Sequence, residues 1–170
     1  GKQTREDLGD DYVGTPADEV VRKFVEDLDR RGKRFGKGFY DYPEGGKKQL
    51  WPGLAEHFPV ADEQPSVEEV KTRLLYIQAL DTVRCMDEGV VTDSADADVG
   101  SIFGWGFPPY TGGTISLIET VGLKEFVAEC DRMAEAYGER FKVPAMLREM
   151  AEKGETFYPR SGASETRSAA

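Results

Sequence analysis

The amino-acid sequence predicts an all-α fold. Apolar residues recur at intervals of three and four in several segments, which is the spacing of a buried helix face. Residues that favour helix starts precede these segments and glycines follow them. No segment alternates apolar and polar residues over the length of a strand. The chain of 170 residues has room for one domain of ordinary size and an appendage.

The first predicted helix begins at Thr15 and Pro16, because proline at the first helical position gives up no hydrogen bond. Its apolar face is formed by Val20, Val21, Phe24, Val25 and Leu28. A run of basic residues and glycines over 30–38 ends this helix. The helix is therefore amphipathic and needs a surface to cover its apolar face.

The chain from 41 to 65 is rich in proline, glycine and charge and has no sustained period. We therefore expect a long connector over 46–65, either ordered or draped over a neighbouring surface. Trp51, Leu54 and Phe58 are expected to pack on a neighbouring surface.

A long helix is predicted to follow, from Ser66 to the stop at Gly89. Ser66 and Glu69 have the spacing of a capping box, in which each side chain bonds the backbone of the other residue. Gly89 supplies the left-handed residue that commonly ends a helix. The apolar positions lie on more than one side, which indicates a central helix: Val67, Val70, Leu74, Leu75, Ile77, Leu80 and Val83.

Another helix is predicted after Asp93, because acidic residues gather where the helix dipole favours negative charge. The residues expected to face the interior are Ala95, Val99, Ile102 and Phe103. The acids do not form a calcium-binding loop, since the twelfth position counted from Asp96 is Phe107 instead of a glutamate.

Three further helices complete the predicted fold. A short one ends at Gly122, the next runs from Leu123 to Gly138, and the last begins at Pro144 and stops near Gly154. The polar segment over 160–170 is predicted to be disordered.

One local pattern occurs twice: a glycine, an aromatic residue three positions later, a Pro-Ala helix start, and then an aromatic pair with a proline. The copies begin at Gly9 and at Gly138. Only the second copy follows a long globular stretch. We therefore predict the tail of a preceding helical domain over 1–45 and a complete helical domain over 66–159, cut from a longer protein.

Composition excludes several classes of function. The 32 acidic and 22 basic residues give a net charge of −10, which argues against nucleic-acid binding. No apolar run approaches the length of a membrane span, and we expect a cytoplasmic protein. Cys85 and Cys130 are expected to be buried thiols rather than a disulfide, and the only histidine is His57.

The glycine- and proline-rich loop over 104–113 is the first candidate site. Prolines fix the backbone and glycines allow close approach, so this loop is expected to be a rigid bend that presents aromatic side chains. The interface candidates are Trp105, Phe107, Pro108 and Tyr110. Packing in the core or lining of a ligand pocket are the alternative roles.

A basic island on the acidic chain is the second candidate site. Arg30, Arg31 and Lys33 could bind a phosphate-bearing ligand such as the tail of coenzyme A. A solvated loop or a contact with an acidic neighbouring domain is the alternative role. Residues alone identify no catalytic, cofactor-binding or metal-binding group.

Several short motifs occur together with this pattern. They are Gly-Lys-Gly-Phe-Tyr-Asp-Tyr over 36–42, Arg-Leu-Leu over 73–75, Glu-Gly over 88–89, Ala-Asp-Ala-Asp over 95–98 and Gly-Phe-Pro-Pro-Tyr-Thr-Gly-Gly over 106–113. In combination they resemble the C-terminal helical domains of 3-hydroxyacyl-CoA dehydrogenases. The order of a domain tail and a complete domain is similar to the multifunctional α-subunit of the fatty-acid β-oxidation complex.

The resemblance implies an orthogonal helical bundle of the 6-phosphogluconate/3-hydroxyacyl-CoA dehydrogenase C-terminal type. It also implies a bifunctional parent with an enoyl-CoA hydratase region and a Rossmann domain that binds NAD and carries the catalytic His-Glu pair. His57 is not that histidine, and Thr72 stands where the family has a catalytic asparagine. The chain is therefore expected to be inactive alone and to support the acyl-CoA cleft.

The implied partners are the upstream Rossmann and helical domains of the parent and, nearby, the acyl-CoA substrate. A thiolase β-subunit and a second copy of the chain are further candidate partners. The rival hypothesis is a free-standing helical module that holds another protein on the surface from Trp105 to Tyr110.

Overall fold

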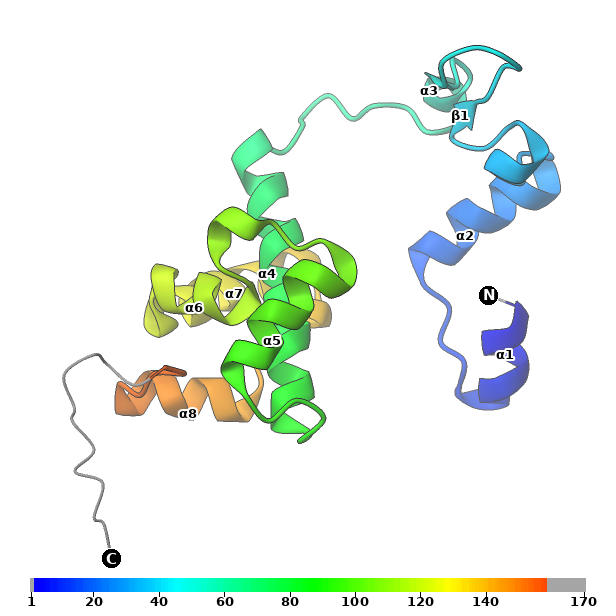
Figure 1. The fold of residues 1–170 in the computed structure, drawn as a ribbon. Helices are drawn as coiled ribbons and strands as arrows, with labels where there is room; N and C mark the ends of the chain where they lie inside the picture. Colours follow the sequence, from blue (N-terminus) through cyan, green and yellow to red (C-terminus); the bar gives the residue numbers. More distant parts are fainter. Residues whose placement is uncertain (1, 159–170) are drawn as a thin grey trace, which may run out of the picture. The chain divides into compact units, whose positions relative to one another are not determined.

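The computed structural model describes residues 2–158 and confirms the predicted helical character. Helices make up 63% of the structure, and the only strands among the described residues form one two-stranded hairpin (Figure 1). The predicted disordered segment 160–170 lies outside the described residues. No described helix combines the length and the apolar character needed to cross a membrane.

The chain divides between Gln64 and Pro65 into two compact units. The elements of the first unit are α1 (Lys2–Leu8), a 3-10 turn (Gly9–Asp11), α2 (Pro16–Arg22), a π-turn (Lys23–Asp27), a second 3-10 turn (Lys33–Phe35), β1 (Tyr40–Asp41), β2 (Gln49–Leu50) and α3 (Leu54–His57). The predicted start of α2 is confirmed, and Asp18 strengthens it. The Asp18 carboxylate accepts hydrogen bonds from the Thr15 N–H at 2.8 Å and from the Thr15 hydroxyl at 2.7 Å.

The hairpin lies where the sequence predicts irregular chain. Strands β1 and β2 pair antiparallel, with Tyr40 opposite Leu50 and Asp41 opposite Gln49. The loop that joins them contains a turn, in which the Gly46 N–H donates to the Pro43 carbonyl at 3.1 Å. Two residues per strand are too few to produce an alternating pattern, so this hairpin leaves no periodic signal in the sequence.

Aromatic rings, rather than an extensive core, hold the first unit together. Phe24 is its one buried large apolar side chain among the described residues. Around it lie Phe39 at 4.2 Å, Phe58 at 5.6 Å and Trp51 at 6.1 Å between ring centroids. The surface on which Trp51 and Phe58 pack is therefore the π-turn that follows α2.

The described part of the second unit consists of five α-helices and the turns between them. Its elements are α4 (Val67–Asp87), α5 (Ser94–Gly100), a π-turn (Ser101–Trp105), a 3-10 turn (Pro109–Thr111), α6 (Thr114–Val121), α7 (Leu123–Tyr137), a 3-10 turn (Glu139–Phe141) and α8 (Ala145–Lys153). Helix α4 packs against α6, α6 packs against α5 and α7, and α7 packs against α8 (Figure 1). The predicted stop at Gly89 is confirmed by its φ of 72°.

A continuous apolar core fills the second unit. It includes Leu80 and Val83 from α4, Ile115 and Ile118 from α6, and Phe126 from α7, all fully buried. Cys130 belongs to this core, whereas Cys85 is only half-buried, and both thiols are free. Burial raises the pKa of the Cys130 thiol to about 12, so this thiol stays protonated and unreactive while the unit is folded.

Two local predictions for this unit are wrong. Ser66 caps α4 through its hydroxyl, which accepts from the Glu69 N–H at 3.1 Å. The Glu69 carboxylate does not complete the capping box; instead it accepts hydrogen bonds from Arg132 at 2.9 Å and from Tyr137 at 2.7 Å. These two bonds connect the start of α4 to α7, and Tyr137 first and Arg132 second lower the pKa of Glu69.

The second error concerns the buried face of α5. Val99 and Phe103 were expected inside, yet they are 55% and 84% exposed. The buried residues of this segment are Ala97, Asp98 and Ser101. Polar groups of α5 face inward because they serve as hydrogen-bond partners for the next helix, as described below.

Candidate interaction surface

The loop after α5 reverses direction within a few residues. Its π-turn closes when the Gly106 N–H donates to the Ser101 carbonyl, five residues back. Gly106 then takes a left-handed conformation with φ of 80°, which a residue with a side chain rarely adopts. The chain therefore turns inward at Phe107, whose N–H also donates to the Ser101 carbonyl, at 3.0 Å.

This turn separates the four predicted interface residues. Trp105 and Tyr110 are 56% and 81% exposed, and Pro108 is half-buried between them. Phe107 is only 1% exposed, because the left-handed Gly106 directs it into the unit. Phe107 is thus unavailable to a partner and anchors the loop from which its neighbours project.

Asp98 is the buried charge that fixes this loop to α6. Its carboxylate accepts hydrogen bonds from the backbone N–H groups of Ile115 at 2.7 Å and Ser116 at 3.1 Å. One turn later on the same helix, the Ser101 hydroxyl accepts from the Thr114 N–H at 3.3 Å. The three free N–H groups at the start of α6 are therefore capped by side chains of α5 and of the π-turn that follows it.

The same carboxylate reaches the end of the described chain. It accepts hydrogen bonds from the Ser116 hydroxyl at 2.5 Å and from the Tyr158 hydroxyl at 2.7 Å. Burial first, and the bond to Asp98 second, raise the pKa of Tyr158 to about 12. Gly113 allows this close approach, because a Cβ there would stand 2.6 Å from the Asp98 Cα.

Outside this rigid frame lies a set of exposed apolar side chains. We use the name aromatic face for Phe103, Trp105 and Tyr110, and Val99 lies one turn before Phe103. Trp105 is held in position by its indole N–H, which donates to Gln78 Oε1 of α4 at 3.1 Å.

The aromatic face adjoins the exposed first half of α4. Val67, Val70 and Leu74 form one stripe of that helix and are all exposed. The pKa of Lys71, which lies beside this stripe, is raised by its bond to Glu68 and to a smaller extent by Tyr110. The stripe and the aromatic face therefore lie on neighbouring parts of the surface.

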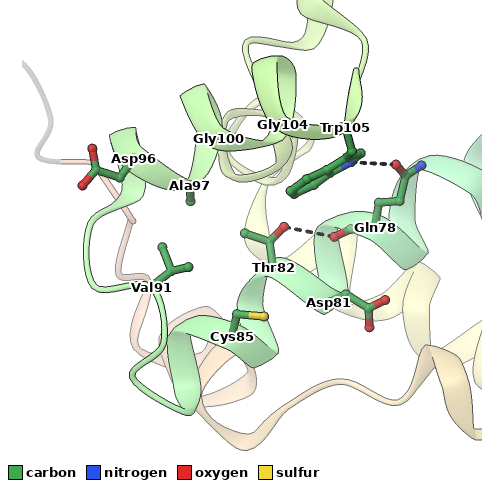
Figure 2. Close-up of a pocket in the computed structure, with 10 residues that line it drawn as sticks. All are labelled: Gln78, Asp81, Thr82, Cys85, Val91, Asp96, Ala97, Gly100, Gly104 and Trp105. Atoms are coloured by element: carbon green, nitrogen blue, oxygen red, sulfur yellow. Dashed lines mark hydrogen bonds between the residues drawn. The ribbon is translucent and has the colours of Figure 1, made fainter. Parts of the chain in front are cut away.

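A groove of about 580 Å³ lies between α4 and α5 (Figure 2). One wall carries Gln78, Thr82 and Cys85 of α4, and the other carries Ala97, Gly100 and Gly104. Figure 2 shows the Trp105 ring over one end of the groove and Val91 at the other. The Thr82 hydroxyl donates to the Gln78 carbonyl at 3.1 Å, so the floor exposes mainly apolar atoms.

The basic island does not form a phosphate site as a whole. Arg30 is buried, its Nε donates to the Gly38 carbonyl at 2.7 Å, and its guanidinium pairs with Asp41. The same guanidinium lies 4.2 Å from the centre of the Trp51 ring. Arg30 therefore ties the hairpin to the π-turn after α2, whose Phe24 carbonyl accepts from the Arg30 N–H at 2.7 Å, and is not free to bind a ligand.

Arg31 and Lys33 remain on the surface. Arg31 pairs with Asp29 at 3.0 Å, and Lys37 pairs with the other oxygen of that carboxylate at 3.0 Å. Lys33 is exposed. Because acids neutralise part of the island, the arrangement is closer to a solvated loop than to a built phosphate site.

The described residues contain no group of three or more His, Cys, Asp or Glu side chains placed to hold a metal ion. Thr72, which the resemblance aligns with a catalytic asparagine, is half-buried on α4. Its neighbour Arg73 lies 3.9 Å from the centre of the Tyr137 ring, so this pair holds α4 and α7 together.

Sequence reasoning missed the role of Asp98 in capping α6, the contact of Glu69 with α7, and the groove. A signal for Asp98 does exist: α6 follows two glycines and has no capping side chain of its own, so its N–H groups need partners from elsewhere. The groove depends on the distance between two helices, which no local pattern specifies. A search of protein-family models found no match for the chain.

Proposed function

We propose that the chain is a non-catalytic helical scaffold, the C-terminal part of an NAD-dependent 3-hydroxyacyl-CoA dehydrogenase of fatty-acid β-oxidation. Its second unit corresponds to an orthogonal helical bundle of the 6-phosphogluconate/3-hydroxyacyl-CoA dehydrogenase C-terminal type. The parent is a cytoplasmic enzyme that also carries enoyl-CoA hydratase, and its upstream Rossmann domain binds NAD. The role of this chain is to pack against the upstream domains and support the acyl-CoA cleft.

The exposed aromatic face is the observation that carries the proposal. Three large rings project from a loop that is fixed to the unit by Phe107 and by the Asp98 bonds. Exposed apolar surface of this kind marks a site of interaction in soluble proteins. A rigid mounting lowers the entropy lost on binding, which suits a permanent contact between domains.

The buried charges support a scaffold over a catalyst. Asp98 bonds to backbone groups of α6, and Arg30 bonds to backbone groups of the hairpin. A general acid or base must reach the proton of a bound substrate, and both groups are buried and engaged in these bonds. The hydrogen bonds of Asp98 and Arg30 therefore stabilise the fold.

An activity assay tests the catalytic part of the proposal. We expect no oxidation of NADH when the chain is mixed with acetoacetyl-CoA, because hydride transfer requires the upstream NAD domain. A complete 3-hydroxyacyl-CoA dehydrogenase in the same assay is the positive control. Turnover by this chain alone contradicts the proposal.

A binding experiment tests the scaffold part. The upstream helical and Rossmann domains of the parent, expressed separately, should bind this chain in titration calorimetry. Phe103→Glu together with Tyr110→Glu should abolish binding, because both changes place charge on the aromatic face. Val90→Glu is the matched control, since Val90 is an exposed apolar residue outside this face. Equal loss with the control contradicts the assignment of the face.

Titration with coenzyme A tests the basic island. Binding that is abolished by Arg31→Glu with Lys33→Glu would place a phosphate site there. We expect no measurable binding, in agreement with the acids that already pair with this loop.

A free-standing interaction module is the second candidate function, and the same exposed rings favour it. The residues encoded before Gly1 distinguish the two. A glycine-rich NAD-binding fold there supports the dehydrogenase parent, whereas a start codon near Gly1 supports the module.

A further inference from the structure

The groove between α4 and α5 is long enough to bind a short helix. Along α4 its wall runs from Gln78 to Cys85, a separation of seven positions or about 10.5 Å of helix rise. A docked amphipathic helix places its anchors at i, i+4 and i+7, a span of the same length. The groove therefore fits two turns of a partner helix.

The opposite wall allows close approach. A Cβ built on Gly100 or Gly104 would meet no atom within 4 Å, so both positions face open space. Both glycines also have ordinary negative φ values, so the backbone does not require glycine at either position. Their effect is to leave the wall free of side chains where a partner's apolar residues would enter.

The acidic residues that line the groove favour a positively charged partner. The only charged residues that line it are Asp81 and Asp96, one on each wall. In Figure 2 the two carboxylates lie at the outer edges of the groove, away from its floor. Asp81 is partly neutralised by Arg84 at 2.5 Å, whereas Asp96 has no ion-pair partner among the described residues.

We propose that this groove binds a basic amphipathic helix of a partner protein. Its apolar residues fill the space between Trp105 and Val91, and lysine or arginine side chains on its flanks reach Asp81 and Asp96. This groove shares Trp105 with the aromatic face, but it does not include Phe103 and Tyr110, which test the contact proposed above, and it does not depend on the identity of the parent enzyme.

A second copy of the chain is a poor occupant for this groove. Two such faces would bring Asp81 and Asp96 of one copy against the same acids of the other. The chain also carries a net charge of −10, which opposes self-association at low ionic strength.

The test uses two synthetic helical peptides of about 15 residues, the length at which isolated helices become stable enough to present a face. Both carry leucine at i, i+4 and i+7; one has lysine and arginine on the flanks and the other has glutamate. Each is labelled and titrated with the full chain by fluorescence anisotropy. We expect the basic peptide to bind at least about tenfold more tightly at low salt, with the difference shrinking as salt rises.

Substitutions on the walls of the groove, compared with a control on α7, locate the binding site. Gly100→Leu should fill the groove and weaken the basic peptide at least about tenfold, a change typical of blocking a central contact. Ala128→Leu, on the exposed face of α7, should leave binding unchanged. Gly104→Leu blocks the same wall and serves if Gly100→Leu alters the circular dichroism spectrum. Asp96→Asn should weaken only the basic peptide.

Three results would overturn the proposal: no binding of the basic peptide up to about 1 mM, equal binding of both peptides, or binding that Gly100→Leu and Gly104→Leu leave intact. Displacement of the peptide by decanoate at equal concentration would show instead that the groove is a site for a small apolar ligand. None of these results bears on the Phe103 and Tyr110 experiment, so the two proposals fail independently.

Discussion

Phe141 in the second unit and Tyr12 in the first follow a glycine at the same spacing, and each precedes a helix that begins at or beside a proline. Tyr12 directly follows a 3-10 turn and Phe141 is the last residue of one, so the two copies of the pattern have similar local structures. Their burial differs. Phe141 is inside the core, as are Leu147 and Ala151 of the following helix, whereas no residue of α2 is fully buried.

The difference lies in what surrounds each copy. Helices α4–α7 supply the core of the second unit, and the described part of the first unit has no counterpart to them. Val13, Val21 and Val25 are consequently exposed. The repeated pattern thus specifies local shape, while burial depends on other helices. A unit of this size with one buried ring has little hydrophobic surface to stabilise it alone.

The largest loss of stability is expected from a substitution in the core of the second unit. Leu80→Ala removes a fully buried side chain of α4 and should lower the free energy of unfolding by about 2–5 kcal/mol. Leu74→Ala, an exposed position on the same helix, is the matched control and should cost under about 0.5 kcal/mol. Urea denaturation followed by circular dichroism measures both. Equal effects would show that this helix is not packed as described.

The next effect concerns the cap of α6. Asp98→Ala leaves buried N–H groups of Ile115 and Ser116 without partners and should cost about 3 kcal/mol. Asp96→Ala, two residues earlier on the same helix and exposed, should cost less than about 0.5 kcal/mol. Reactivity of the buried Cys130 thiol toward a disulfide reagent reports the opening of this unit. If Cys130 reacts at the same rate in both variants, Asp98 does not stabilise this unit by capping α6.

A smaller loss is expected in the first unit. Arg30→Met keeps the apolar stem but removes the donors to Gly38 and Asp41, and should cost about 2 kcal/mol. Trp51 fluorescence, measured in a Trp105→Phe background, follows this change because Arg30 lies over the indole ring. Arg34→Met is the exposed control. We expect the second unit to keep its denaturation curve, and a coupled loss would mean that the units do not fold separately.

The smallest effect depends on pH. Asp131 accepts two hydrogen bonds from Arg148, at 2.7 and 3.0 Å, and this pairing lowers the pKa of Asp131. Because the folded pKa lies below the unfolded value of about 3.9, the pair stabilises the unit above that pH and the contribution disappears as pH falls through the folded pKa.

Both side chains of this pair are more than a third exposed, so the contribution is about 0.2–1 kcal/mol. Asp131→Asn should therefore lower stability at pH 7 and have no effect at strongly acidic pH. Glu135→Gln, an exposed change on the same helix, is the control. A difference that persists in acid would show that Asp131 acts through something other than its charge.

Local signals were sufficient to predict α2 and the helices of the second unit, whereas α1 and the short α3, which lies inside the predicted connector, were not predicted. The starts at Thr15, Ser66 and Asp93 and the stop at Gly89 all rest on capping chemistry within a few residues, and the structure confirms them. Helix α7 was predicted with its inward face correct, because Phe126 and Cys130 follow the helical period without interruption.

The face of α5 could not be predicted from periodicity. Hydrophobic spacing places Val99 and Phe103 inside, but the uncapped start of α6 requires Asp98 and Ser101 at that face. A tertiary hydrogen-bond requirement therefore overrides the apolar pattern. Arg30 illustrates the same limit, since its burial depends on a hairpin that leaves no periodic trace.

The π-turn between Ser101 and Trp105 also sets the direction in which the Trp105 indole projects from the helix axis. Each residue advances a helix by about 100°, and a π-turn has the geometry of one residue inserted into an α-helix. Deleting a single residue within 102–104 would therefore swing the indole a quarter turn or more around the axis and break its bond to Gln78. At this position the length of the chain matters more than the identity of its side chains.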